Sequence, residues 1–121
     1  MRVVVDTNVL VDYLTGLAAA RLELARDVRS GICLNTWMEV LVGARSEAED
    51  AELRAFLGGF QLLPITNEVA SRAVEVRRLR RIRLPDAIIW ATALVESRLL
   101  VSRNTRDFPG DEPGVRVPYM I

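Results

Sequence analysis

The segment Arg2-Val3-Val4-Val5-Asp6 places three consecutive β-branched residues between two charged ones. A strand this continuously apolar is typical of the centre of a parallel sheet, where both faces are covered. Thr7-Asn8 interrupts the run, and the apolar spacing from Val9 to Leu14 predicts a helix that Gly16 ends. This part of the chain therefore indicates a strand followed by a helix.

The same alternation continues along the chain. Further strands are predicted at residues 32–34, 60–64, 99–102 and 115–117, and helices at residues 18–30, 36–44, 46–57, 67–83 and 87–97. Alternating strands and helices predict one α/β domain over residues 1–121, a three-layer α/β/α sandwich around a parallel sheet of four to five strands.

Two helix starts are predicted from capping residues. Thr36 with Glu39 three residues later has the spacing of a capping box, and Asn67 precedes the helix that contains most of the arginines. In that helix, the spacing predicts that Val74 and Leu79 face the core, together with Val69, Ala70, Ala73 and Val76.

The composition excludes several classes of enzyme. The 121 residues contain no His and one Cys, and all 16 basic residues are Arg, against 16 acidic residues. A Ser-His-Asp triad, a His-ligated zinc site, a P-loop lysine and a Schiff base are therefore excluded. Any catalysis must come mainly from carboxylates, and we expect a metal ion with them.

Nothing in the sequence resembles an export signal or a membrane span. Asp6 interrupts the first apolar run, and the longest, from Ala87 to Val95, is far shorter than the roughly 20 residues that cross a bilayer. We therefore expect a cytoplasmic protein with no membrane partner, in which Cys33 is a small core residue.

Acidic side chains recur where predicted strands end or the next helices begin. Asp6 ends the first strand, Glu39 lies in the helix after the second, Asp86 begins the most apolar helix, and Asn104 and Asp107 follow the fourth strand. In a parallel sheet these positions share one edge, where ligands bind. We therefore expect the acids to converge.

Each acid also has a structural explanation. Asp6 could cap a turn, Glu39 could complete the capping box, and Asp86 could favour the helix dipole. Glu39, however, is followed by Val40-Leu41-Val42, and a buried Glu without a partner is costly. Several carboxylates in one place raise one another's pKa, and Mg²⁺ or Mn²⁺ relieves that repulsion.

The zero net charge conceals an uneven distribution. Six arginines lie between Arg72 and Arg83 with only Glu75 among them, whereas Glu47 to Glu52 holds four acids and no basic residue. Segregated charge of this kind builds a positive face for phosphates, and a solvated helix face is the alternative.

Four segments resemble the signature blocks of PIN-domain ribonucleases, in the right order and over essentially the whole chain. The closest similarity is to VapC-type toxins of prokaryotic toxin–antitoxin pairs. The segments are Val5-Asp6-Thr7-Asn8-Val9-Leu10, Thr36-Trp37-Met38-Glu39-Val40-Leu41-Val42-Gly43, Leu84-Pro85-Asp86-Ala87-Ile88-Ile89-Trp90-Ala91-Thr92-Ala93 and Ser102-Arg103-Asn104-Thr105-Arg106-Asp107-Phe108.

The resemblance implies Mg²⁺- or Mn²⁺-dependent endonucleolytic cleavage of RNA by a homodimer that a small antitoxin neutralises, its tail covering the active site. Toxin and antitoxin would then form a hetero-oligomer. Asp6, Glu39 and Asp86 match the three core metal-binding acids of the family. Asn104 stands where many relatives have an acid, and Asp107 matches a later acid, so either residue completes the metal shell.

The same resemblance suggests supporting roles for three polar residues. Thr7 or Asn8 would position a water or a phosphate, and Ser102 takes a place that Thr often holds in the family. The Arg72–Arg83 helix would follow the RNA backbone or contact the antitoxin. Because water attacks, cleavage would leave 5′-phosphate and 3′-hydroxyl ends.

Two other functions remain open from the residues. The uncharged Asn104 is compatible with a catalytically weak module whose acidic pocket receives an Arg or Lys of the antitoxin. An aspartate-nucleophile phosphatase or a phospho-receiver domain also has an Asp after its first strand. Both usually need a Lys, which this chain lacks, and the phosphatases also need a second Asp where Asn8 stands.

Overall fold

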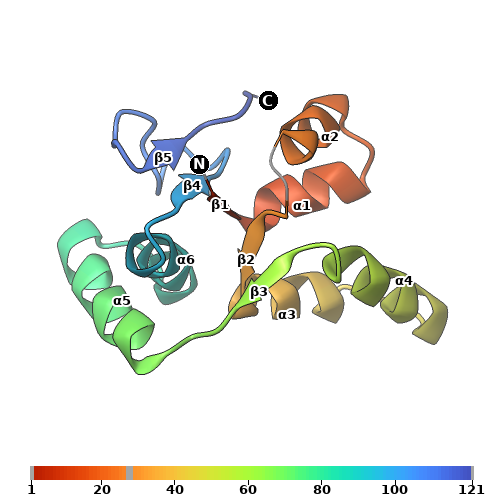
Figure 1. The fold of residues 1–121 in the computed structure, drawn as a ribbon, viewed down its shortest axis with the longest axis horizontal. Helices are drawn as coiled ribbons and strands as arrows, with labels where there is room; N and C mark the ends of the chain where they lie inside the picture. Colours follow the sequence, from red (N-terminus) through yellow and green to blue (C-terminus); the bar gives the residue numbers. More distant parts are fainter. Residues whose placement is uncertain (1, 27–28, 121) are drawn as a thin grey trace.

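The computed structural model describes residues 2–26 and 29–120. These residues form one α/β unit in which strands and helices alternate along most of the chain (Figure 1). The elements are β1 (Val3–Val5), α1 (Thr7–Leu14), α2 (Ala18–Ala25), β2 (Gly31–Cys33), α3 (Leu34–Val42), α4 (Glu47–Leu57), β3 (Gln61–Leu63), α5 (Asn67–Arg80), α6 (Leu84–Val95), β4 (Leu99–Val101) and β5 (Val115–Arg116).

Within the described residues, the strands form one five-stranded parallel sheet in the order β3-β2-β1-β4-β5. The predicted fold class is thereby confirmed. β1 is the central strand, and all three of its residues are buried, as its β-branched sequence predicts. The strand order reverses beside β1, where β2 extends one way and β4 the other, and a crevice at the carboxyl ends of these strands is the usual ligand site of such a sheet.

Helices cover both faces of the sheet (Figure 1). α5 and α6 lie on one face and share a core with Val4, Leu100 and Phe108. α1, α3 and α4 lie on the other face, where a second core contains Val5, Leu10 and other buried residues. Alternate residues of β1 thus enter opposite cores, which produces the three predicted layers. Cys33 is a buried core residue with a free thiol, as expected.

Several helix boundaries differ from the predicted ones. The capping box is wrong: α3 begins at Leu34 with Cys33 at its N-cap, so Thr36 lies inside the helix. Thr36 is fully buried, and its hydroxyl lies 3.0 Å from that of Thr7, so a tertiary contact uses the oxygen that a cap would need. α5 begins at Asn67, but its cap is Thr66, whose hydroxyl accepts from Val69 N at 3.1 Å.

Two further predictions about helices are wrong. α2 ends at Ala25 rather than Ser30, and Arg29 has a left-handed backbone (φ 53°) that a helix does not contain; residues 27 and 28 of the predicted helix lie outside the described residues. On α5, Val74 and Leu79 are 43% and 82% exposed, as is Ala70 to a large extent, so only part of the predicted apolar face is core. Among the described residues, no helix has the length and apolarity to cross a membrane.

Candidate active site at the carboxyl edge of the sheet

Asp6 lies at the point where the strand order reverses. It follows the last residue of β1 and is the N-cap of α1, where its Oδ1 accepts from Thr7 N at 2.7 Å. Its own amide donates to Val101 O at 2.9 Å, so β1 and β4 are joined up to this residue. The cap geometry holds the carboxylate at the edge of the sheet, and its side chain is almost fully buried.

Two neutral side chains hold the other oxygen of Asp6. Ser102, the first residue after β4, donates its hydroxyl to Asp6 Oδ2 at 2.7 Å, and Asn8 Nδ2 donates to the same oxygen at 3.1 Å. The Ser102 hydroxyl also accepts from Asn104 N at 3.0 Å. Ser102 therefore connects the first acid to the loop that follows β4.

Burial dominates the protonation of Asp6. Loss of solvent raises the pKa of Asp6 to about 6, although the hydrogen bonds from Ser102 and Thr7 favour the ionised form. The neighbouring carboxylates of Asp86 and Glu39 contribute smaller parts of the same rise. Three acids far apart in sequence thus interact in space, as the sheet topology predicts.

Glu39 reaches the same place from α3. Thr7 donates its hydroxyl to Glu39 Oε1 at 3.2 Å, so the first residue of α1 contacts both Glu39 and Thr36. The apolar residues after Glu39 do not bury it: Val40 and Leu41 turn into the core, whereas Glu39 lies on the exposed side of the helix. An exposed side chain changes rotamer at little cost.

Asp86 lies in the first turn of α6, after Pro85, and is buried. Arg83 Nε donates to Asp86 Oδ2 at 3.4 Å. Burial raises the pKa of Asp86; Arg83 opposes this shift and the Asp107 carboxyl adds to it. α3 and α6 are joined at this edge because Asn35 Nδ2 donates to Pro85 O at 3.1 Å.

Asn104 and Asp107 form one turn after β4. Asn104 Nδ2 donates to Asp107 Oδ2 at 3.0 Å, and Asp107 N donates to Asn104 Oδ1 at 3.3 Å. Asn104 thus holds Asp107 through its amide, and the Asp107 carboxyl interacts with that of Asp86.

The structure brings four of the five predicted residues around one hollow of about 310 Å³, here called the acid pocket. Asp107 borders a neighbouring hollow of about 490 Å³ instead, and Asn104 and Arg83 border both. The acid pocket is lined by Asp6, Thr7, Asn8, Val11, Glu39, Arg83, Asp86, Ile89, Arg103 and Asn104.

The side chains around the acid pocket have the chemistry that a hard divalent cation needs. All candidate ligands are oxygens, and three of roughly four acceptor positions on Asp6 are used, which leaves one for a cation. Among residues 2–26 and 29–120, no three acidic side chains stand close enough to hold an ion as they are, because like charges repel and local donors hold each one. The donor set is the oxygen-only kind that Mg²⁺ or Mn²⁺ prefers, and the exposed Glu39 side chain would have to turn inward to join Asp6 and Asp86 around such an ion.

Sequence reasoning assigned Ser102 and Thr7 only supporting roles, and it missed Arg103 and Asp12. Ser102 is fully buried and holds Asp6, and Thr7 contacts Glu39. Arg103 borders the acid pocket and forms an ion pair with Asp12 of α1. The signal for Ser102 was its position directly after a strand next to β1 in the sheet, which becomes visible only when the strand order is known.

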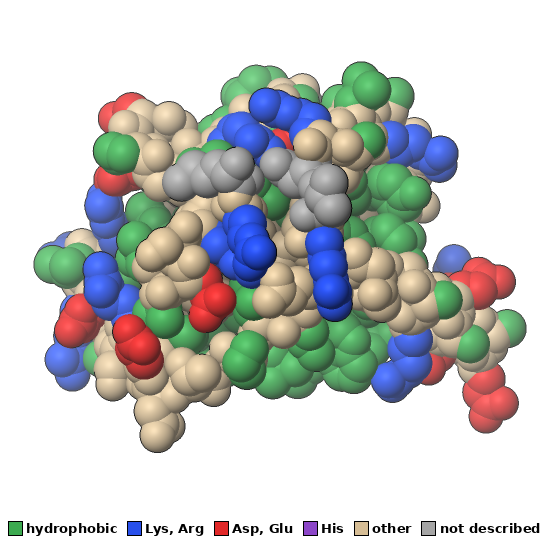
Figure 2. All heavy atoms as spheres, viewed as in Figure 1, with side chains coloured by type: hydrophobic (Ala, Val, Ile, Leu, Met, Phe, Trp, Pro, Cys, Tyr) green, Lys and Arg blue, Asp and Glu red, His purple; other side chains and the backbone are tan. Residues whose placement is uncertain are grey.

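Three arginines surround the neighbouring hollow, here called the arginine pocket: Arg81, Arg83 and Arg106. Arg81 and Arg83 follow α5, so the predicted Arg72–Arg83 cluster ends beside the acids. Along α5 itself the cluster is partly neutralised, with Arg72 paired to Glu75 at 3.8 Å and Arg80 to Glu112 at 2.6 Å. Figure 2 shows acidic and basic side chains intermixed along the edge of the molecule where α5 lies.

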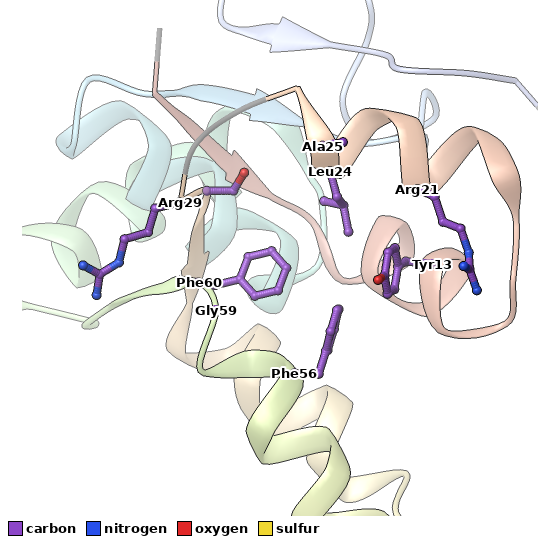
Figure 3. Close-up of a pocket in the computed structure, with 9 residues that line it drawn as sticks. Tyr13, Arg21, Leu24, Ala25, Arg29, Phe56, Gly59 and Phe60 are labelled. Atoms are coloured by element: carbon purple, nitrogen blue, oxygen red, sulfur yellow. The ribbon is translucent and has the colours of Figure 1, made fainter.

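A third hollow, the aromatic pocket, lies between α1, α2 and α4 (Figure 3). Tyr13 stacks on Phe56 with ring centroids 5.1 Å apart, and Phe56 meets Phe60 edge-on at 5.3 Å. Arg21 lies over Tyr13, and Arg29 lies across the hollow from it (Figure 3). The aromatic rings and the alkyl side chain of Leu24 give this pocket a surface suited to apolar contact, with Arg21 and Arg29 at its sides.

Comparison with known proteins agrees with this geometry. The PIN domain family matches residues 3–109. Ribonuclease VapC10 of Mycobacterium tuberculosis is 35% identical over 127 residues, which cover 98% of this chain and 94% of that protein. The toxin-antitoxin complex from Klebsiella pneumoniae contains a chain that is 41% identical, with a TM-score of 0.92 and coverage of 98% of this chain and 99% of that one.

The DNA-bound VapBC complex from Salmonella typhimurium contains a more distant relative. That chain is 22% identical, with a TM-score of 0.81 and coverage of 96% of both chains, and this similarity concerns the fold alone. The family match, the identity to the M. tuberculosis ribonuclease and the acid pocket at the sheet edge agree. The chain therefore belongs to the PIN-domain family and, within it, to the VapC-type ribonucleases.

Proposed function

We propose that the chain is a divalent-metal-dependent endoribonuclease that acts as the toxin of a toxin–antitoxin pair. The observation that carries the proposal is the convergence of Asp6, Glu39 and Asp86, from three separate elements, on one hollow where the strand order reverses. Buried acids with raised pKa values in a cleft are typical of functional sites.

In this proposal Asp6, Glu39 and Asp86 hold one Mg²⁺ or Mn²⁺, and Asp107 or Asn104 completes the shell directly or through water. The ion, when bound, supplies a water of lowered pKa and positive charge for the phosphate oxygens. Asn104 orients Asp107 through their mutual hydrogen bonds.

The remaining residues position these ligands. Ser102 and Asn8 hold Asp6 Oδ2 so that the ionised carboxylate keeps one orientation. Thr7 directs Glu39 toward the pocket. Arg83 neutralises Asp86 and lies on the ridge between the acid and arginine pockets, where a phosphodiester passing from one to the other meets it.

RNA is the proposed substrate because several arginines lie beside the acids. Arg81, Arg83 and Arg106 offer guanidinium groups to successive phosphates, and phosphate contacts of this kind make affinity depend on salt rather than on sequence. Hydrolysis by water leaves 5′-phosphate and 3′-hydroxyl ends, which a ligase assay or end labelling identifies.

The proposal is tested with purified protein and total RNA. Asp6→Asn, Glu39→Gln and Asp86→Asn should each lower Mg²⁺-dependent cleavage by at least about a hundredfold while the circular dichroism spectrum stays native. Glu52→Gln, an exposed acid on α4, is the matched control and should cleave like wild type. Full activity in the three acid variants would overturn the proposal.

A small antitoxin is the proposed protein partner, in a hetero-oligomer built on a homodimer in the cytoplasm. The K. pneumoniae relative comes from a toxin-antitoxin complex, and this chain offers two surfaces for such a partner. The aromatic pocket accepts apolar side chains, and the acid pocket attracts an Arg or Lys. Phe60→Asp should abolish binding of the cognate antitoxin and leave RNA cleavage intact.

A catalytically weak binding module is the second candidate. Asn104 favours it, because an amide contributes no charge at a position where many relatives carry an acid. Asn104→Asp separates the two functions. In an enzyme, the variant should change the metal concentration needed for half-maximal cleavage, whereas a pure binding module cleaves no RNA with Mg²⁺ or Mn²⁺ before or after the substitution.

A further inference from the structure

Arg103 is held in place by two elements far from it in sequence. Its Nε and Nη2 donate to the two oxygens of Asp12 in α1, the second at 3.2 Å. Tyr119, in the segment after β5, donates its hydroxyl to Asp12 Oδ2 at 2.7 Å. Asp12, Arg103 and Tyr119 are here called the Arg103 cluster.

Asp12 is the buried member of the cluster, and Arg103 and Tyr119 are half-buried around it. The Asp12 side chain is 10% exposed and that of Arg103 34%. Burial alone would raise the pKa of Asp12, but the hydrogen bonds from Arg103 and Tyr119 keep it below its usual value. A paired, hydrogen-bonded and shielded guanidinium has one preferred orientation, unlike an arginine on an open surface.

This orientation places Arg103 on the acid pocket. The residue follows Ser102, its amide lies 3.5 Å from Asn8 Oδ1, and it borders the hollow together with Asp6. Its charge acts on that of Asp6 without forming an ion pair. Arg103 therefore adds a fixed positive charge at the acid pocket.

The guanidinium retains donors for another ligand. Of its five N–H groups, Asp12 takes one on Nε and one on Nη2. For the other three, no acceptor is found within residues 2–26 and 29–120. A phosphate oxygen is the acceptor that a preoriented guanidinium beside a nuclease site suits best.

We propose that Arg103 binds a phosphate of the RNA at the acid pocket and that Asp12 and Tyr119 are positioning residues that orient it. This inference rests on the proposed ribonuclease activity. The preorientation lowers the entropy lost when substrate binds, and it links the segment after β5 to the reaction.

The alternative is a purely structural role, in which the cluster only attaches the segment after β5 to α1. The two roles can be separated because a second contact attaches the C-terminal segment to the helices. Arg116 Nη2, in β5, donates to the buried Glu23 of α2 at 2.5 Å. The Tyr119 ring also packs on the core beneath α1. Removing only the Tyr119 hydroxyl therefore leaves the segment attached.

The test compares Tyr119→Phe, Asp12→Asn, Arg103→Lys and Arg103→Ala in Mg²⁺-dependent cleavage of one defined RNA, with melting temperature measured in parallel. Arg103→Ala should raise KM at least about tenfold, and Tyr119→Phe about threefold with a melting temperature near that of wild type. Arg103→Lys should recover only part of the loss, because an ammonium cannot serve Asp12 and a phosphate in the same geometry.

The salt dependence of RNA affinity is a second measurement, and a purely structural role of the cluster would not change it. In RNA binding by an inactive Asp86→Asn background, Arg103→Ala should reduce the slope of log Kd against log salt by about one phosphate contact. Arg45→Ala is the matched control, since Arg45 is an exposed arginine that pairs with Glu49 at 3.7 Å and is not among the described residues that line the acid and arginine pockets.

The outcomes for the two proposals are distinct. If wild type cleaves no RNA with Mg²⁺ or Mn²⁺, the proposed function fails. If wild type cleaves, and Tyr119→Phe and Arg103→Lys keep the wild-type KM, the cluster is structural only and this inference is wrong. Because both substitutions are conservative, misfolding of Arg103→Ala would not prevent the decision.

Discussion

At the scale of single residues, Asp6 carries the largest electrostatic conflict in the site. The fold buries its carboxylate and provides only uncharged donors to it, from Thr7, Asn8 and Ser102. Its pKa rises to about 6 as a result. A buried anion that lacks a cationic partner destabilises the folded protein, and a bound cation removes that penalty. This arrangement serves binding at the expense of stability.

Asp6→Asn should therefore stabilise the metal-free protein at neutral pH. The pKa of Asp6 is raised from 3.8 to about 6 on folding, so the wild type loses free energy of unfolding as pH rises through that window. The variant lacks this loss, and its advantage should grow to at most about 3 kcal/mol above pH 6. Urea unfolding in EDTA between pH 4 and 8 measures it.

Asp12→Asn is the control for this pH series. The pKa of Asp12 is lowered on folding, so its contribution to stability is lost as pH falls, and its substitution should cost most at neutral pH. Parallel stability curves for wild type and Asp6→Asn across the whole range would contradict the account of Asp6.

Ser102→Ala should weaken activity through Asp6. The hydroxyl favours the ionised form of Asp6, so its removal should raise the pKa of Asp6 and shift the acidic limb of the pH–rate profile to higher pH. Loss of the buried hydrogen bonds should also cost about 1–2 kcal/mol of stability. Ser102→Thr keeps the hydroxyl and should restore the profile; an unshifted profile in Ser102→Ala would exclude this role.

At the scale of elements, the sequence predicts most of the architecture. Each strand lies within its predicted segment or begins one residue before it, because continuous β-branched runs bounded by turns identify buried parallel strands. Ser46 is the N-cap at the predicted start of α4 and accepts from Glu49 N at 3.0 Å. Thr36 has the same local signal but lies inside α3, because a contact with Thr7, 29 residues away, determines its place.

The candidate site, like the fold, could be predicted from the sequence only in part. Convergence of the acids could be predicted, since the carboxyl ends of parallel strands share one edge. The contacts that orient them could not: Ser102 reaches Asp6 across 96 residues, and Arg103 reaches Asp12 across 91. Such pairs depend on which strands are neighbours and on side-chain orientation, neither of which local patterns contain.

The start of α5 provides a direct test of local capping. Thr66→Ala should cost about 1 kcal/mol of unfolding free energy, because the Thr66 hydroxyl satisfies Val69 N at the first turn. Asn67→Ala, one residue later and exposed, should change stability by less than about 0.5 kcal/mol. Chemical denaturation of the two variants measures the difference, and the reverse order would restore Asn67 as the cap.

At the scale of the whole molecule, the zero net charge results from separated charges. Asp6, Glu39 and Asp86 gather at one pocket, and Arg81, Arg83 and Arg106 gather at the next. Exposed apolar side chains also lie together. Leu79 of α5 is 82% exposed and, with Leu94 of α6, borders a hollow of about 430 Å³. Exposed apolar side chains in a cluster are typical of protein interfaces.

Leu79→Glu should therefore weaken the proposed homodimer. The substitution places a charge on α5 at a side chain that is 82% exposed, so the monomer should keep its fold. Light scattering after size exclusion should show about twice the monomer mass for wild type and the monomer mass for the variant. The same mass for both proteins would mean that this surface is not the dimer interface.

The central claim is that the acid pocket hydrolyses RNA with a divalent cation. The most direct measurement is the cleavage rate of one end-labelled RNA by a single preparation of wild-type protein, first stripped with EDTA and then supplied with excess Mg²⁺ or Mn²⁺. We predict no cleavage after stripping, recovery on addition of either ion, and products with 5′-phosphate and 3′-hydroxyl ends. Cleavage in EDTA at the same rate as with the ion would contradict the account. So would an Asp6→Asn variant whose cleavage rate with Mg²⁺ or Mn²⁺ equals that of wild type.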